Sequence, residues 1–262
     1  MRKNNCLMPI FSIVAGIVGM ILRKKELATI FDSATGLAER GATVTILLGI
    51  LSAVVVLISI LYAVIGCKNG KAEEPYEVIM SPRSPLGLLL QFVSGAAIIV
   101  GGILYFFAAK AEGVGGTYTL AFAVLAIATG VCQFVLSAAS YRKKKTEGMG
   151  IAVVVAPLYL CMWLVATYRN FGTEPSLLRF CGMCIALIFA TLSFYYTAGF
   201  AFGKKKLKRT VAVNLIAIYM CIVLMADFVS LSTRMILGGL VIIMCVNVTS
   251  LVINSHKKKR VK

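Results

Sequence analysis

Long apolar segments alternate with short polar connections along the whole 262-residue chain. Within these segments hydrophobic residues follow one another almost without interruption, and they lack the period-two alternation that marks the strands of a membrane barrel. A helix needs about 20 apolar residues to cross a bilayer, and eight segments come close to that length. The eight predicted spans are residues 7–22, 42–66, 86–109, 117–140, 149–168, 178–202, 210–230 and 235–254.

The connections between these spans are short, so consecutive helices should pack as antiparallel neighbours in four hairpins. Hydrophobic residues make up 60% of the chain and charged residues only 14%, whereas a soluble domain carries about 25% charged residues. The sequence therefore predicts an all-α fold, a polytopic membrane helical bundle that forms one domain over residues 1–262.

The first apolar segment has a basic start, as a signal peptide would. No clear small-x-small cleavage site precedes the basic residues Arg23, Lys24 and Lys25, so we expect a retained first span. The stretch ELATIF that follows these residues could extend its helix.

Basic residues predict the orientation of the spans. With both termini on one side, 19 Lys and Arg residues lie on that side and 8 on the other. The positive-inside rule then places both termini in the cytoplasm, which gives an N-in, C-in protein of the cell membrane. The first span disagrees locally, because Arg23, Lys24 and Lys25 flank its outer end more densely than Arg2 and Lys3 flank its inner end.

The net charge of +17 would suit a nucleic-acid-binding protein, but the placement of the charges does not. Basic clusters such as RKKK at 142–145 and KKKLKR at 204–209 directly adjoin the ends of apolar segments, and no separate basic domain is present in the sequence. We therefore expect the lipid bilayer as a partner, with anionic lipid head groups at these clusters, and no nucleic acid.

Asp227, in the run IVLMADFVSLSTR, is the only acidic residue within a long apolar run. Ionisable groups inside a membrane are candidates for function. Asp227 follows Thr210 by 17 residues, which places it roughly 25 Å along a core about 30 Å thick, near the outer surface. Arg234, Arg179 and Arg169 should lie at the same level. The pattern favours an ion pair that holds helix ends together; an anion-binding rim or a proton-linked gate is the alternative.

Four amide side chains lie in four different spans, all roughly 6–12 Å from the cytoplasmic boundary: Gln91, Gln133, Asn214 and Asn247. Interhelical hydrogen bonds would explain them, and Asn214 with Asn247 is the natural pair because their spans form a tight hairpin. The functional alternative is a polar vestibule, open to the cytoplasm, in which a small solute binds. The first interpretation is favoured.

Small residues recur at four-residue spacing in several spans, a pattern that lets membrane helices approach closely. The rows are Ala15 with Gly19, Ala97 with Gly101, Ala126 with Gly130, and Gly182 with Ala186 and Ala190. In so large a bundle we expect most of them to serve packing within the chain.

Enzymatic chemistry is not indicated. The single histidine, His256, lies among lysines in the tail, and the sequence holds no HExxH, GxSxG or P-loop motif. The CxxC pattern CGMC at 181–184 falls in an apolar span, away from the soluble setting of redox motifs. We expect no metal, no cofactor and no catalytic residue.

Three stretches, ELATIFDSATGL at 26–37, WLVATYRNFGTEP at 163–175 and FYYTAGFAFG at 194–203, resemble an eight-span membrane protein family of Gram-positive anaerobic bacteria that has no assigned function. The resemblance implies a shared fold and no substrate. The function that we expect from the sequence is a small-solute permease or permease-like membrane subunit; the alternative is a non-transporting membrane anchor, or an assembly or partner-binding protein. A broken helix would favour transport, and Pro157, in the fifth span, is a candidate for such a break.

Overall fold

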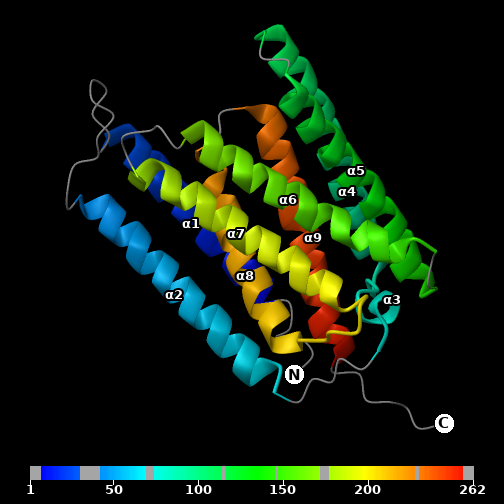
Figure 1. Cartoon of the computed structure of the whole chain (residues 1–262). Coiled ribbons are helices and arrows are strands. Elements are labelled where there is room, and N and C mark those ends of the chain that lie inside the picture. Colours follow the sequence, from blue (N-terminus) through cyan, green and yellow to red (C-terminus); the bar gives the residue numbers. More distant parts are fainter. Residues whose placement is uncertain are drawn as a thin grey trace, which may run out of the picture.

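The computed structural model describes residues 7–29, 42–68, 74–113, 116–144, 147–171, 177–227 and 230–255. These residues form nine helices (Figure 1): α1 Leu7–Thr29, α2 Thr43–Gly66, α3 Tyr76–Ile79, α4 Pro85–Ala111, α5 Thr117–Arg142, α6 Met149–Phe171, α7 Leu177–Gly199, α8 Leu207–Leu224 and α9 Leu231–Ser255. All of them except α3 are long and apolar enough to cross a membrane. The predicted all-α, polytopic membrane helical bundle is therefore confirmed.

Each predicted span corresponds to one long helix, with small differences at the ends. Helix α1 continues through the basic residues to Thr29, as the stretch ELATIF suggested. Helix α8 ends at Leu224, six residues before the predicted end of its span. Helix α9 begins at Leu231, so Arg234 lies in its first turn and not in a connection.

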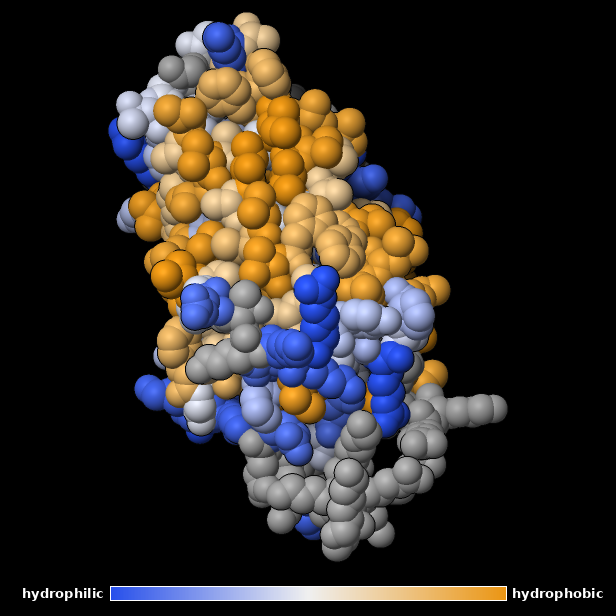
Figure 2. Space-filling view, turned by 90° about the vertical axis from the view of Figure 1, so that its right-hand side faces the viewer, coloured by the Kyte–Doolittle hydropathy of each residue, from blue (hydrophilic) through white to orange (hydrophobic). Residues whose placement is uncertain are grey.

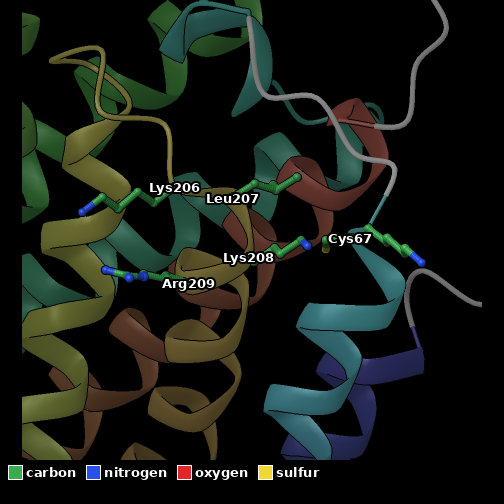
Figure 3. Close-up of a pocket in the computed structure, with 6 residues that line it drawn as sticks. Cys67, Lys206, Leu207, Lys208 and Arg209 are labelled. Atoms are coloured by element: carbon green, nitrogen blue, oxygen red, sulfur yellow. The ribbon is translucent and has the colours of Figure 1, made fainter.

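The eight long helices alternate in direction, so α1 begins and α9 finishes at the same end of the bundle (Figure 1). We name this end, where α2 finishes and α8 begins side by side (Figure 3), the basic end. The opposite end, where α1 and α8 finish, is named the Asp227 end. The shared end agrees with termini on one side of the membrane; that this side is the cytoplasm stays a prediction.

Helices α8 and α9 form the centre of the bundle and are mostly buried. Helix α8 packs against α1, α2 and α7, and α9 packs mainly against α4. Helix α2 lies at the edge, because only Val55, Ser59 and Ala63 of its 24 residues are buried. The sequence order of the helices therefore differs from their order in space.

A broad hydrophobic face separates the hydrophilic ends of the molecule (Figure 2). Large apolar side chains on several helices are exposed, for example Leu57, Ile65 and Ile151 with exposures of 60%, 70% and 76%. Such a continuous apolar surface suits the hydrocarbon of a lipid bilayer and would be unfavourable in water. The molecule is a multi-pass membrane protein in contact with lipid.

Small residues bring several helices into close contact. A Cβ added at Gly130 of α5 would lie 2.7 Å from the carbonyl oxygen of Gly95 on α4, and one at Gly239 of α9 would lie 2.8 Å from the carbonyl oxygen of Ser94. Backbones approach this closely only where a side chain is absent. Gly182, by contrast, has no atom within 4 Å of an added Cβ. Packing within the chain thus accounts for Gly130 of the predicted rows.

The short helix α3 was not predicted. The Nδ2 atom of Asn254, on α9, donates to the carbonyl oxygens of Val78, Ile79 and Ser81 at 3.3, 3.0 and 2.9 Å. These bonds supply a donor to carbonyls at the end of α3, where the Val78 carbonyl also accepts from the Ser81 amide at 3.4 Å. Tyr76, at the start of α3, is buried. Within the connection between α2 and α4, α3 is therefore folded into the basic end.

Candidate functional site

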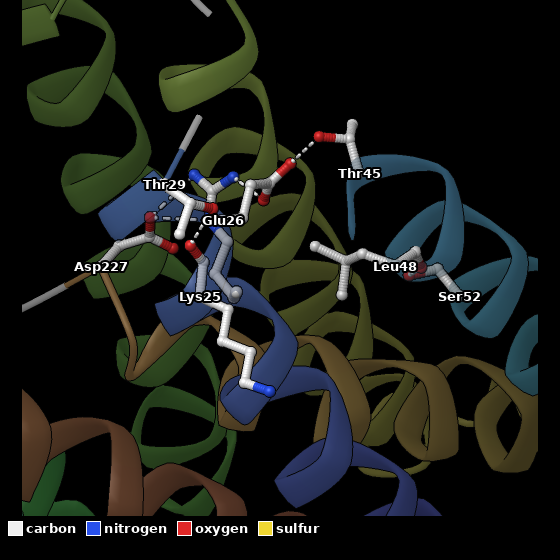
Figure 4. Close-up of polar contacts among 8 residues, drawn as sticks. Lys25, Glu26, Thr29, Thr45, Leu48, Ser52 and Asp227 are labelled. Atoms are coloured by element: carbon white, nitrogen blue, oxygen red, sulfur yellow. Dashed lines mark hydrogen bonds and ion pairs between the residues drawn. The ribbon is translucent and has the colours of Figure 1, made fainter. Parts of the chain in front are cut away.

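A buried charge network lies at the Asp227 end (Figure 4). Arg23, in the last two turns of α1, donates from Nε and Nη2 to Oδ1 of Asp227 at 3.0 and 2.8 Å. Its Nη1 atom contacts Oε2 of Glu26 at 2.6 Å. The side chains of Arg23, Glu26 and Asp227 are only 5%, 1% and 6% exposed. Burial of charged groups this deep depends on direct pairing.

Local sequence explains the shape of the network. Arg23 and Glu26 are three residues apart, so both side chains lie on the same face of α1. Asp227 lies in the turn that directly follows α8. The hydroxyl of Thr45, in the first turn of α2, donates to Oε1 of Glu26 at 2.7 Å. The network therefore joins the ends of three helices, α1, α2 and α8.

The structure describes the side chains of two of the three arginines named from the sequence, Arg169 and Arg234. Arg169 is exposed near the end of α6, and Arg234 is half-buried in the first turn of α9. The side chain of Arg179 lies outside the described residues. Arg23, which sequence reasoning treated as part of the basic flank at the outer end of the first span, is a partner of Asp227. The Arg–Glu spacing in RKKE was the signal that could have pointed to it. An anion site at this rim stays a prediction.

Asn214 belongs to a structural contact. Its Oδ1 atom accepts a hydrogen bond from the Ser193 hydroxyl at 2.9 Å, and its Nδ2 atom donates to the carbonyl oxygen of Thr210 at 2.8 Å. All three residues are buried. The predicted pair of Asn214 with Asn247 is therefore wrong: Asn214 ties α8 to α7. Helix α8 packs against both α7 and α9, so the facing of the side chain decides which polar group Asn214 meets.

Gln133 and Asn247 do come together, at a small interior cavity. Its lining also includes Thr129, Thr197 and Tyr76. The cavity holds about 20 Å³, which is room for about one water molecule. Tyr76 of α3 belongs to this lining and is 5% exposed, a contribution that sequence reasoning missed. A four-residue helix between two long spans gives too weak a hydrophobic pattern to predict.

The hydrogen bonds of these two amides differ. The Nε2 atom of Gln133 donates to the Ser137 hydroxyl of its own helix at 3.2 Å. The Asn247 side chain, 7% exposed, makes no hydrogen bond within the described part of the chain. Its amide is therefore available to a molecule in the cavity.

Gln91 is buried on α4 and does not belong to the cavity lining. Its Oε1 atom has no hydrogen-bond partner among the described residues. The four predicted amides thus differ in their surroundings. Asn214 is hydrogen-bonded between two helices, Gln133 and Asn247 line the cavity, and Gln91 is buried apart from them.

Pro157 does not break its helix, because α6 is continuous from Met149 to Phe171. Cys181 and Cys184, of the CxxC pattern, are exposed and half-buried on α7. Within the described ranges, no three His, Cys, Asp or Glu side chains are grouped so that they could hold a metal ion. Neither a broken helix nor a metal centre is thus available there to support a function.

No known protein family, curated protein or solved structure matches this chain. The likeness to an eight-span family therefore rests on the three sequence stretches, and the arguments about function rest on the geometry.

Proposed function

We propose that the chain is a non-enzymatic, non-transporting protein of the cell membrane, an anchor or assembly subunit that acts by binding partners. The observation that carries this proposal is the size of the interior cavity. At about 20 Å³, the space beside Gln133 and Asn247 accommodates about one water molecule, and buried waters of this kind are a normal part of protein structure.

The packing at the centre of the bundle supports the same proposal. Large side chains with almost no exposure, including Tyr159, Leu187 and Ile236, fill the centre of the bundle. Asp227, the acidic residue that a coupled transporter would use, is paired with Arg23 at one end of the bundle. Transporter sites commonly combine broken helices with polar groups near the bilayer midplane, and α6 is unbroken at Pro157.

A small-solute permease or permease-like subunit is the second candidate, and one observation favours it. The unbonded amide of Asn247 lines the cavity together with Gln133, Thr129 and Thr197. In that function the structure represents a closed state, and Tyr76 would have to move away before a solute could reach these groups.

Accessibility to a thiol reagent tests the two functions without knowledge of a substrate. All eight cysteines are replaced, and a single cysteine is introduced as Asn247→Cys. A membrane-impermeant maleimide is then applied to right-side-out and inside-out vesicles. Lys204→Cys, at an exposed position of the basic end, is the accessible control, and Ala186→Cys, at a position 1% exposed, is the buried control.

A non-transporting bundle leaves the cysteine at position 247 as unreactive as the one at position 186. Labelling at position 247 from either side of the folded protein, at a rate near that of position 204, would favour the permease and remove the first proposal. The Lys204→Cys control also tests orientation, because N-in, C-in topology exposes it only in inside-out vesicles.

A further inference from the structure

A pocket of about 280 Å³ lies at the basic end, between the finish of α2 and the beginning of α8 (Figure 3). Cys67 and Lys68 line it from the side of α2, and residues 206–209 line it from α8. A site needs about 10–15 Å³ of such space to hold one water molecule, so this volume is many times that of a single water. It is therefore large enough for a phosphate group with its substituents.

The charge of the lining has one sign. Four of its six residues are cations, and none is acidic: Lys68, Lys206, Lys208 and Arg209. In Figure 3 the side chain of Lys208 extends across the pocket toward Cys67, while Lys206 and Arg209 extend to the other side of α8. Lys208 is thus the cation placed to face a bound group directly, and the others raise the local positive potential.

The backbone of α8 adds hydrogen-bond donors. Lys206 occupies the N-cap position without a side-chain cap bond. The first amide bonded in this helix is that of Thr210, which donates to the Lys206 carbonyl oxygen at 3.0 Å. The preceding amides, of Leu207, Lys208 and Arg209, lie in the first turn, where a helix presents free N–H groups and a partial positive charge. Phosphate groups bind at such places in many proteins.

The neighbouring surface indicates the source of the phosphate. Helix α2, beside the pocket, is the least buried of the long helices. In its last turns Leu61, Val64 and Ile65 are 57%, 51% and 70% exposed, a surface suited to acyl chains. A lipid could therefore lie along α2 with its head group in the pocket. We propose that the pocket between α2 and α8 binds the phosphate of an anionic phospholipid head group.

This proposal does not depend on whether the protein transports a solute. It differs from the general attraction between basic clusters and anionic membranes, because it assigns one site. The cluster Arg142, Lys143 and Lys144 supplies the contrast. It carries three exposed cations at the same end of the bundle, but it lies at the C-terminus of α5, where the helix dipole opposes an anion.

The test compares lipid binding by two charge-matched variants of the full-length protein in detergent. One carries Lys206→Gln, Lys208→Gln and Arg209→Gln; the other carries Arg142→Gln, Lys143→Gln and Lys144→Gln. Native mass spectrometry measures bound phosphatidylglycerol against phosphatidylcholine, with inorganic phosphate as a competitor. Size-exclusion chromatography establishes that each variant is folded, and Lys208→Gln alone serves if the triple pocket variant is not.

We expect the pocket variant to lose its preference for phosphatidylglycerol by about tenfold or more, since it removes the cations that lie beside the first-turn N–H groups of α8. The α5 variant, whose cations lie at a helix C-terminus, should lose less than about twofold. Inorganic phosphate at millimolar concentration should displace little lipid, because it lacks acyl chains to contact α2. Equal losses in both variants would overturn the proposal in favour of general surface attraction. Phosphate binding without a preference for the lipid would overturn the lipid as its source.

Discussion

Arg23 and Asp227 are 204 positions apart in the sequence, yet two hydrogen bonds of 3.0 and 2.8 Å join the guanidinium of one to the carboxylate of the other. The contact fastens the end of α1 to the turn after α8. Glu26 extends it to α2 through Thr45. The network thus ties the edge helices to the centre of the bundle.

Removing Arg23 should destabilise the protein. Arg23→Gln leaves the carboxylates of Glu26 and Asp227 buried without the charge that both contact, and loss of one partner of a buried pair costs about 3 kcal/mol or more. The melting temperature in detergent measures the effect. Arg169→Gln, which removes an exposed arginine, is the control and should change it little.

Charge exchange identifies the partner of Asp227 more directly. Asp227→Arg should prevent accumulation of folded protein, and addition of Arg23→Asp should restore part of it, because the pair is then re-formed with reversed signs. The assignment would be contradicted if Arg23→Asp failed to rescue and Arg169→Asp, Arg179→Asp or Arg234→Asp succeeded. That result would support the ion pair predicted from the sequence.

A single methyl group at Gly130 should weaken the contact between α4 and α5. The added Cβ would lie 2.5 Å from Cγ1 of Ile99 and 2.7 Å from the carbonyl oxygen of Gly95, so the helices must move apart. Overpacking of this kind costs about 1–3 kcal/mol. Gly182→Ala is the matched control, because nothing lies within 4 Å of its added Cβ. Equal melting temperatures for the two variants would refute the prediction.

The two buried asparagines should differ in their contribution to stability. Asn214→Ala removes two hydrogen bonds and leaves the Ser193 hydroxyl without its acceptor, which costs about 1–2 kcal/mol in a membrane bundle. Asn247→Ala removes the same volume but no hydrogen bond within the described residues, so its melting temperature should fall less. A larger fall for Asn247→Ala would mean that this amide has a bound partner in the cavity.

Much of the fold follows from the sequence, because the length and polarity of an apolar segment suffice to predict a membrane helix. The site was harder to predict. Depth in the bilayer can be counted along one helix, so Asp227 was placed near the outer surface; its neighbour depends on which helices touch. That choice is made by close contacts such as Gly239 against Ser94, which bring α9 to α4. Helices α8 and α9 do pack together, as the hairpin argument required, but Asn214 faces α7 and Asn247 faces the cavity beside α5, so the two amides do not pair.

Asn254 should hold α3 in place. Asn254→Asp keeps the shape of the side chain but removes the Nδ2 donor that serves three carbonyl oxygens, and it sets a carboxylate against them. We expect α3 to detach, so that trypsin cleaves at the neighbouring exposed Arg83 several-fold faster. Thr249→Ala, which removes only hydrogen bonds within α9, is the control. Unchanged cleavage in Asn254→Asp would show that the Asn254 side chain does not hold α3 in place.

The pKa of the Cys67 thiol should respond to the positive charge in the pocket at the basic end. Burial raises the pKa of Cys67 above its ordinary value of 9.0, while the positive charge of Lys208 acts in the opposite direction. A raised thiol pKa means that the folded protein keeps this proton after the unfolded chain has lost it. The contribution to stability is therefore present below about pH 9 and is lost as the pH rises further.

In a variant that retains Cys67 as its only cysteine, alkylation by iodoacetamide should consequently be slow at neutral pH, because the thiolate is the reactive form. Its rate should continue to rise above pH 9. Lys208→Gln removes the opposing charge, raises the pKa of Cys67 further and should shift the rate profile to higher pH. Arg142→Gln removes a charge from the end of another helix and should leave the profile unchanged. A profile that Lys208→Gln moves to lower pH would show that this lysine does not face the thiol.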